Sequence, residues 1–293
     1  MEKWGLGPDI LLAEFPGLII ARMSGYGQTG PYRDRAGHDN NYLSISGLNG
    51  YSGRGSDRTP IMGMPVADIA GGSLHAVIGI LAAVNQRHIS GEGQQIDISM
   101  TDAMFSLNAL FGSTYLSAGV EPTSGSMSLN GGSFYDYYQT SDNRYLSIGS
   151  LEPQFFQVLC QTLGDDELLT LANQQDSETQ KALRAKLDTI IATKTLAQWR
   201  EIFNDREACV EPVLTFAEAC EYQDSAQREM IVDVKTPNGG SQRQVGSALK
   251  LSKSAPEYGV SGGAIGQHSS EILADLGFDK DAIATLRSSG AVA

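Results

Sequence analysis

Residues 17–31 read Gly-Leu-Ile-Ile-Ala-Arg-Met-Ser-Gly-Tyr-Gly-Gln-Thr-Gly-Pro. The first six of these residues form a short, largely apolar run that includes two β-branched isoleucines, which predicts a short buried strand, Gly17–Arg22, and the glycines that follow predict a loop at its end. Loops after such strands carry much of the chemistry of α/β proteins. We therefore predict an α/β fold and look for functional residues close behind this loop.

The loop itself does not have the pattern of a nucleotide site. Gly25, Gly27 and Gly30 have G-x-G-x-x-G spacing, but Pro31–Gly37 is too polar to form the packed helix of a dinucleotide fold. No strand ending in an acidic residue follows about twenty positions on, and no Gly-Lys-Ser/Thr follows the loop. These observations exclude a Walker loop and speak against nicotinamide binding.

The first half of the chain continues with alternating helices and strands. Val66–Arg87 has the apolar density and length of a buried helix, Gln94–Met100 alternates as a strand, and Thr101–Leu116 predicts another apolar helix. Val120–Ser133 is rich in Gly, Ser, Thr and Pro, which is typical of a linker. We place a domain boundary there.

The second half predicts a smaller α+β domain. Phe134–Tyr138 and Arg144–Gly149 look like a hairpin, and Glu152-Pro153 opens a helix that runs through Leu163. Amphipathic periodicity predicts helices at Glu178–Ile191 and Thr195–Phe203. Helix start and stop residues predict two more, at Ser269–Leu276 and Asp279–Leu286. We expect a Rossmann-like large domain built from residues 1–120 and 240–293, and a small domain at 134–230.

Charge and composition limit the partners. The chain has 34 acidic and 21 basic residues, so its net charge of −13 argues against nucleic acid and against an anionic membrane. The apolar stretches are too short to cross a bilayer, no signal peptide is visible, and we expect a cytoplasmic protein. The three cysteines lack metal-ligand spacing and predict neither a metal site nor a disulfide. A polyanionic ligand would need a locally basic patch, which four arginines could provide: Arg33, Arg35, Arg54 and Arg58.

Two segments concentrate groups that could move protons. Ala36-Gly-His-Asp-Asn-Asn-Tyr42 brings together an imidazole, a carboxylate, two amides and a phenol, although a histidine in such a cluster is often only a structural hydrogen-bond partner. Asp68 could be an ordinary helix N-cap, but its apolar neighbours could desolvate the carboxylate, and Gly71-Gly72 would let a ligand approach the helix amides. Those amides could then stabilise an enolate oxygen. Glu152 precedes Pro153 at a helix start and could simply favour that terminus.

With these segments, the chain resembles the family III coenzyme A transferases (CaiB/BaiF), and within them the α-methylacyl-CoA racemase branch. The resemblance rests on residues 24–31, 36–42, 68–72, 91–97, 132–138, 151–155, 209–214 and 266–273, and so covers essentially the whole chain. It implies that His38 and Asp68 face each other across the α-carbon of a 2-methylacyl thioester and exchange the roles of acid and base. No metal or redox cofactor is implied, since coenzyme A is part of the substrate.

The resemblance also implies further site residues and a partner. Glu152 would orient His38, Lys3 would contact the coenzyme, and the segment from Gly37 through Asp39, Asn40 and Asn41 to Tyr42 would line the thioester and pantetheine site. Two chains would interlock as a homodimer, with the active site between the large domain of one and the small domain of the other. That arrangement would bring Glu152 to the partner's histidine.

Two alternatives remain open. In the transferase branch, the aspartate at position 68 is a nucleophile that forms an acyl anhydride and moves coenzyme A between carboxylic acids. The histidine and glutamate favour the racemase. The family has a longer amino end, to whose interior Met1–Pro8 aligns, so we expect the usual N-terminal segment to be missing here. An inactive relative is therefore the second alternative.

Overall fold

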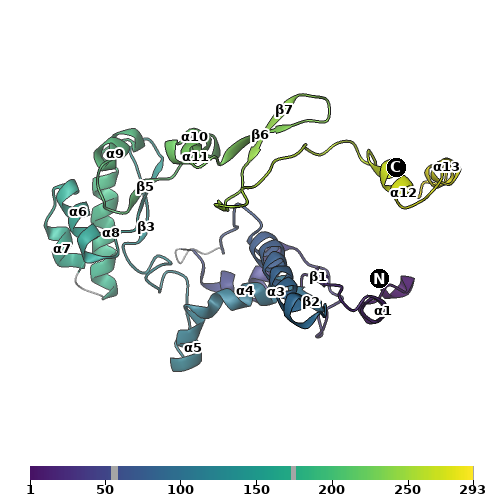
Figure 1. Cartoon of the computed structure of the whole chain (residues 1–293). Coiled ribbons are helices and arrows are strands. Elements are labelled where there is room, and N and C mark those ends of the chain that lie inside the picture. Colours follow the sequence, from purple (N-terminus) through teal and green to yellow (C-terminus); the bar gives the residue numbers. More distant parts are fainter. Residues whose placement is uncertain (54–58, 173–175, 293) are drawn as a thin grey trace. The chain divides into compact units, whose positions relative to one another are not determined.

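The computed structural model describes residues 1–53, 59–172 and 176–292. They form two compact units, Met1–Val213 and Leu214–Ala293, and each is considered by itself (Figure 1). The predicted grouping of residues 240–293 with residues 1–120 in one domain stays a prediction.

A parallel strand pair organises the first part of the chain. Strands β1 (Ile20–Ser24) and β2 (Gln95–Ser99) pair in parallel, with Ile20 opposite Gln95 and Ser24 opposite Ser99. Parallel neighbours need a long crossover, and here the crossover is largely helical. The mixed α/β class is thus confirmed. Strand β1 begins three residues later than we expected, and its side chains alternate between half-buried and exposed.

The crossover carries one long helix that begins in an unusual way. Residues Ala67–Leu74 form a wide π-helical turn, η3, which continues directly into α3 (His75–Ser90). Gly91 ends the helix in the left-handed conformation, at a φ of 78°. The predicted helix exists, but it is not buried as we expected. Leu81, for example, is 63% exposed, because the described residues cover one side of α3 and leave the other uncovered.

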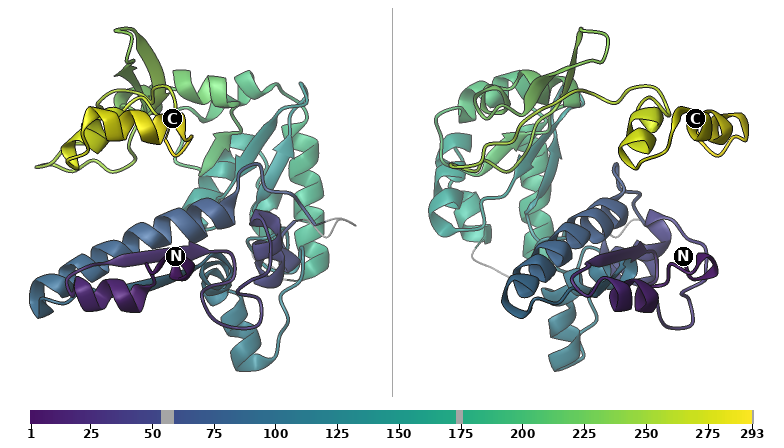
Figure 2. Two further views of the ribbon diagram at one scale, coloured as in Figure 1. Left: turned by 90° about the vertical axis from the view of Figure 1, so that its right-hand side faces the viewer. Right: turned by 45° about the vertical axis from the view of Figure 1, so that its right-hand side comes forward.

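Helix 67–90 is also long and apolar enough to cross a membrane, by length and composition alone. Our expectation that no stretch reaches that length is wrong for this helix. One side of α3 lies along β1 and β2 in both sets of views (Figures 1 and 2), and the other side is exposed. A Cβ added at Gly79 would lie 3.1 Å from Cγ2 of Ile96 in β2.

Shorter helices complete this part of the chain. The predicted helix at 101–116 is broken in the structure into α4 (Met100–Ser106), a 3-10 turn (Leu107–Ala109) and α5 (Gly112–Ala118). The others are the 3-10 helices at Glu2–Trp4 and Leu48–Tyr51, α1 (Pro8–Glu14) and α2 (Asp39–Ile45). No helix or strand occurs between Gly119 and Tyr135, as expected of a linker.

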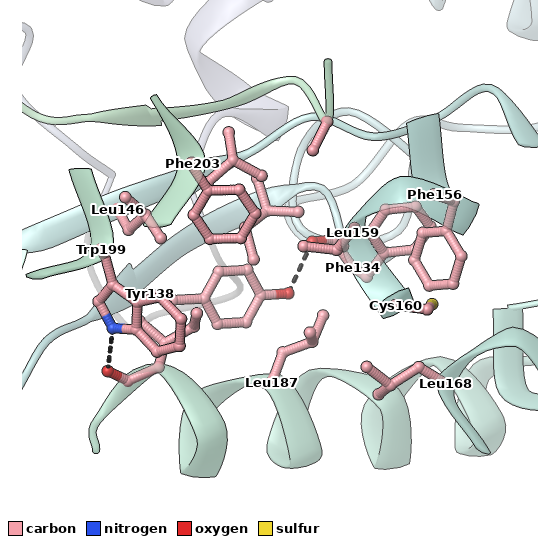
Figure 3. Packing of buried hydrophobic residues seen from close by; sticks show 14 of the residues in the cluster. Phe134, Tyr138, Leu146, Phe156, Leu159, Cys160, Leu168, Leu187, Trp199 and Phe203 are labelled. Atoms are coloured by element: carbon pink, nitrogen blue, oxygen red, sulfur yellow. Dashed lines mark hydrogen bonds between the residues drawn. The ribbon is translucent and has the colours of Figure 1, made fainter. Parts of the chain in front are cut away.

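Residues 134–213 build the larger hydrophobic core. An antiparallel sheet, ordered β3-β4-β5, packs against helices that match the predicted ones closely. Trp199 and Tyr138 are buried in this core, and Trp199 Nε1 donates to the Ile191 carbonyl at 2.8 Å (Figure 3). The elements are β3 (Asp136–Gln139), β4 (Tyr145–Ile148), β5 (Val210–Pro212), α6 (Pro153–Leu163), α7 (Glu167–Ala172), α8 (Ser177–Ile191) and α9 (Leu196–Phe203). The hairpin and three of the four helices are confirmed, while α7 and β5 were not predicted.

The second unit contains an antiparallel hairpin and four helices among its described residues. Strands β6 (Ile231–Lys235) and β7 (Ser241–Val245) pair with Ile231 opposite Val245. The helices are α10 (Phe216–Glu221), α11 (Gln223–Gln227), α12 (Ser269–Asp275) and α13 (Lys280–Ser288). The two terminal helices agree with the prediction, and Asp279 caps α13 by accepting from the Ala282 N–H at 2.8 Å.

Candidate active site

His38 lies at the start of α2, where it is the N-cap residue with extended backbone (φ −132°, ψ 175°). Asn41, one turn later, folds its side chain back so that Oδ1 accepts from the His38 N–H at 3.0 Å. This satisfies one of the donors that a helix start would otherwise leave open. The His38 backbone is thereby fixed, while its side chain is exposed and open to a ligand.

The next residue joins this turn to the second candidate segment. Asp39 Oδ1 accepts a hydrogen bond from the backbone N–H of Asp68 at 3.0 Å, across 29 positions of sequence. Both residues are half-buried. The structure therefore brings the turn of His38 and the helix of Asp68 into contact, while the two-base hypothesis stays a prediction.

Asp68 is the second residue of the π-helical turn and not its cap. Val66 takes the N-cap position, with helical backbone and no side-chain capping bond. The Asp68 N–H is engaged by Asp39, and the Ile69 N–H donates to the Pro65 carbonyl at 3.0 Å. We expected amides at this helix start to hold an enolate oxygen, and for these two amides the expectation is wrong because both already have partners.

Tyr42 packs behind the segment that carries His38. Its ring is buried, packs at right angles on Tyr26 with centroids 5.2 Å apart, and its hydroxyl donates to the Gly37 carbonyl. Burial raises the pKa of the Tyr42 hydroxyl, and the charges of Tyr26 and Asp68 raise it further. The phenol therefore stays protonated at neutral pH, close to the Asp68 carboxylate.

Two other predicted contact residues, Asn40 and Lys3, have different surroundings. The Asn40 carbonyl accepts from Ser44 Oγ at 2.6 Å, which stabilises α2, and the Asn40 side chain is exposed. Lys3 lies exposed in the first 3-10 helix, and in the part of the chain that the structure describes no hydrogen bond or ion pair ties its side chain to the His38 turn. Their roles in coenzyme binding stay predictions.

The predicted basic patch is described only in part. Arg33 pairs with its neighbour Asp34 at 3.4 Å, and the Arg35 guanidinium lies 4.8 Å from the centre of the Tyr32 ring. Arg54 and Arg58 lie outside the described residues. The two described arginines are exposed and within a few residues of His38, where an anionic ligand could reach them.

Glu152 lies at the start of α6, as its N-cap residue, and its side chain is exposed. Within the described chain no hydrogen bond or ion pair links it to His38, so its predicted role depends on a second chain and stays a prediction. The negative charge of Glu152 acts on Cys209. Partial desolvation of the Cys209 thiol raises its pKa most, and the charges of Glu152 and Glu211 raise it further. Cys209 lines a cavity of about 380 Å³ together with Asn130, Tyr135 and Tyr137.

Sequence reasoning missed the residues that hold the glycine-rich loop. Asp97 Oδ2 accepts from the Gln28 N–H at 2.9 Å, and Thr101 Oγ1 donates to the Gly25 carbonyl at 2.8 Å. Asp97 lies in β2, which pairs with the strand that leads into the loop, and Thr101 lies in the first turn of α4, directly after β2. A polar pair at the carboxyl end of a parallel strand was the available signal.

The comparisons with known proteins agree with this geometry. The family model described as "CoA-transferase family III" matches residues 1–269. The chain belongs to this family. This family III chain is 35% identical over 291 residues to the alpha-methylacyl-CoA racemase of Homo sapiens, covering 98% of its own length and 75% of the relative. It is also 30% identical over 294 residues to the succinyl-CoA–D-citramalate CoA-transferase of Chloroflexus aurantiacus, covering 98% and 72%.

Solved structures support the same fold. This family III chain superposes on a CaiB/BaiF family protein from Brucella suis with a TM-score of 0.76 and 26% identity, covering 94% of the chain and 72% of that structure.

Among the described residues of the chain, no group of three or more His, Cys, Asp or Glu could hold a metal ion. His75, the first residue of α3, has its Nδ1 2.6 Å from the Ala70 carbonyl oxygen.

Proposed function

We propose that this chain is an isomerase that inverts the α-carbon of 2-methylacyl-CoA thioesters by 1,1-proton transfer. His38 and Asp68 act as its two acid/base groups. As an α-methylacyl-CoA racemase-like enzyme, it needs no metal and no redox cofactor, and coenzyme A enters as part of the substrate.

The mechanism breaks and remakes one carbon–hydrogen bond. One base removes the α-proton, and the bonding electron pair moves toward the thioester carbonyl to give an enolate. The other base, in its protonated form, returns a proton to the opposite face. The two bases have then exchanged protonation states, and the reverse reaction starts from the other enantiomer. Asp68 would be the base for one enantiomer and His38 for the other.

One observation carries this proposal: the hydrogen bond from the Asp68 N–H to Asp39, the residue next to His38. This bond joins the turn that carries the imidazole to the turn that carries the carboxylate, and the two residues are 30 positions apart in the sequence. The similarity to the human racemase over 98% of the chain supports the same activity.

Exchange at the α-carbon tests the proposal. A 2-methylacyl-CoA incubated with the chain in deuterated water should gain one deuterium at the α-position and lose optical purity. A correctly folded chain that leaves the α-hydrogen in place would rule out the racemase. A thermal shift with the same acyl-CoA then separates an inactive relative from one that binds, because a ligand that binds the folded state alone raises the apparent stability.

Coenzyme A transfer is the second candidate, and the similarity to the citramalate CoA-transferase favours it. Asp68 would then attack the thioester carbonyl, release the coenzyme A thiolate and form an acyl anhydride. The thiolate would attack the Asp68 carbonyl of this anhydride, release the first acid and leave Asp68 as a coenzyme A thioester. A second carboxylate would attack that thioester and form a new anhydride, and the released thiolate would attack its acyl carbonyl to give the product thioester and free Asp68. Labelled free acid should exchange into acyl-CoA in this case. That exchange should survive His38→Ala better than α-proton exchange does.

Assembly and location belong to the same proposal. Two chains would interlock as a homodimer in the cytoplasm and act in lipid metabolism without a nucleic-acid or membrane partner. Glu152 of one chain would then orient the partner's histidine. Light scattering of the purified chain tests the dimer directly.

A further inference from the structure

We propose that Asp39 is a positioning residue, whose carboxylate sets the distance and direction between His38 and Asp68. This role rests on the proposed proton transfer and differs from a contact with the coenzyme. The Asp39 carboxylate oxygen lies 3.0 Å from the Asp68 backbone nitrogen, within ordinary hydrogen-bond length. Asp39 thus does for η3 what an N-cap side chain does for a helix, but from a different element.

The remaining contacts between the two segments lie further from the chemistry. A small core of Tyr42, Leu43, Ala67 and Met104 packs α2 against η3 about one helical turn behind His38. The bond from the His38 N–H to Asn41 is local to α2. Within the described residues, the Asp39 bond is the one hydrogen bond or ion pair between residues 38–45 and 67–74.

The π-helical turn makes this bond more important. A π-helical turn is wider than an α-helical one and is uncommon outside functional sites. The N-cap residue Val66 makes no side-chain hydrogen bond to the start of η3. The first backbone N–H groups of η3 therefore need other acceptors. Asp39 supplies one of these partners and at the same time fixes the backbone that carries the Asp68 carboxylate.

Loss of the Asp39 bond should affect inversion more than exchange. A single base can remove an α-proton and return a deuteron to the same face, which gives exchange without inversion. Inversion needs both bases in place within one lifetime of the enolate. Release of the bond should therefore lower inversion more than exchange, whereas simple loss of folded protein would lower both equally.

Two variants separate the hydrogen bond from the charge. Asp39→Asn keeps an oxygen that can accept from the Asp68 N–H, while Asp39→Ala removes it. The matched control is Asp34→Ala, which removes a nearby exposed carboxylate that pairs with Arg33 next to it. Inversion, α-hydrogen exchange and the KM for a 2-methylacyl-CoA are measured for each protein in deuterated water.

We expect Asp39→Ala to lower the rate of inversion by about 10- to 100-fold, with a smaller loss of exchange and little change in KM. Asp39→Asn should recover most of that loss. Equal losses of exchange and inversion would overturn the proposal. An Asp39→Asn variant as impaired as Asp39→Ala, with a raised KM, would overturn it as well and would instead favour a charge that contacts the coenzyme.

Amide hydrogen exchange at residue 68 gives a readout that does not depend on activity. Protection of the Asp68 N–H should persist in the parent chain and in Asp39→Asn and be lost in Asp39→Ala, while amides of α8 stay protected in all of them. Unchanged protection in Asp39→Ala overturns the positioning role. A parent chain without α-hydrogen exchange overturns the proposed function, and the two failures are therefore distinct.

Discussion

The ring of Tyr42 occupies the space that a side chain at Gly25 would need. A Cβ added at Gly25 would lie 2.3 Å from Cε1 of Tyr42, far inside van der Waals contact. Gly25 lies in the glycine-rich loop after β1, and Tyr42 lies in the helix that begins behind His38. The loop and the candidate site are therefore packed as one piece, and the glycine is required by this contact.

Gly25→Ala should destabilise the protein by about 1–3 kcal/mol, since the added methyl group must displace a buried ring or the backbone beside it. Urea unfolding measures the change in free energy. Gly50→Ala is the control, because a Cβ there meets nothing within 4 Å and its backbone is not left-handed. Equal midpoints for the two variants would contradict this packing.

Removing either proposed base should abolish inversion without unfolding the chain. We expect His38→Ala and Asp68→Ala each to lower the rate of α-proton exchange by about 100- to 10,000-fold for the enantiomer whose proton that residue removes. The two pure enantiomers are assayed separately in deuterated water. His88→Ala is the control, since that histidine is exposed near the end of α3. Full exchange in either variant would argue against the two-base assignment.

The core under the small sheet should respond to truncation strongly. Leu187 in α8 is fully buried, so Leu187→Ala should lower the free energy of unfolding by about 2–5 kcal/mol. Leu116→Ala removes a side chain that is 82% exposed and should change it by less than about 0.5 kcal/mol. Denaturant curves of the two variants give the comparison. A similar small effect at both positions would mean that residues 134–213 are less tightly packed than described.

The three thiols should differ in reactivity. Burial raises the pKa of Cys160 to about 11, with further contributions from the charges of Asp165 and Asp166. Cys209 is exposed and Cys220 is half-buried. At pH 8 a thiol reagent should label Cys209 and Cys220 in the folded protein and reach Cys160 after unfolding. Rapid labelling of all three under native conditions would contradict the burial of Cys160.

The raised pKa of Cys160 also makes the stability of the folded protein depend on pH. Because the folded state holds the Cys160 proton more tightly than the unfolded state does, this stabilisation is complete below the unfolded pKa of about 8.5. It should be lost progressively as the pH rises toward about 11. Cys160→Ala should therefore flatten the loss of stability on the alkaline side, as measured by thermal unfolding between these pH values.

Much of the fold could be predicted because local signals were strong. The hairpin of residues 134–149, the helix start at Glu152-Pro153 and the helical periodicity of α8 and α9 have short-range causes, and all were confirmed. Helix α3 was predicted as a helix but wrongly as buried, because apolar density does not say whether the described residues of one chain cover that surface. The continuous helix of residues 67–90 also ends three residues beyond the predicted end at Arg87.

The candidate site was predictable in its residues but not in its contacts. His38 and Asp68 were singled out from polar clustering and apolar flanks. The bond between Asp39 and the Asp68 N–H spans 29 positions and has no local pattern, so the oxyanion role of that amide was expected when the amide was in fact occupied. The π-helical turn also escaped prediction, since the apolar pattern of Val66–Arg87 predicts a helix but does not distinguish a π-helical turn from an α-helical one.

That turn has a consequence for how this region can change. A π-helical turn holds one more residue per hydrogen-bonded ring than an α-helical turn does. The wide turn therefore accommodates one residue more than a regular α-helical turn in the same place. Deleting one residue within 70–73 should narrow η3 to regular α-helix and keep Asp68 and the apolar face of α3 nearly in phase. A deletion within α3 itself would instead rotate the two sides of the helix against each other by about 100°.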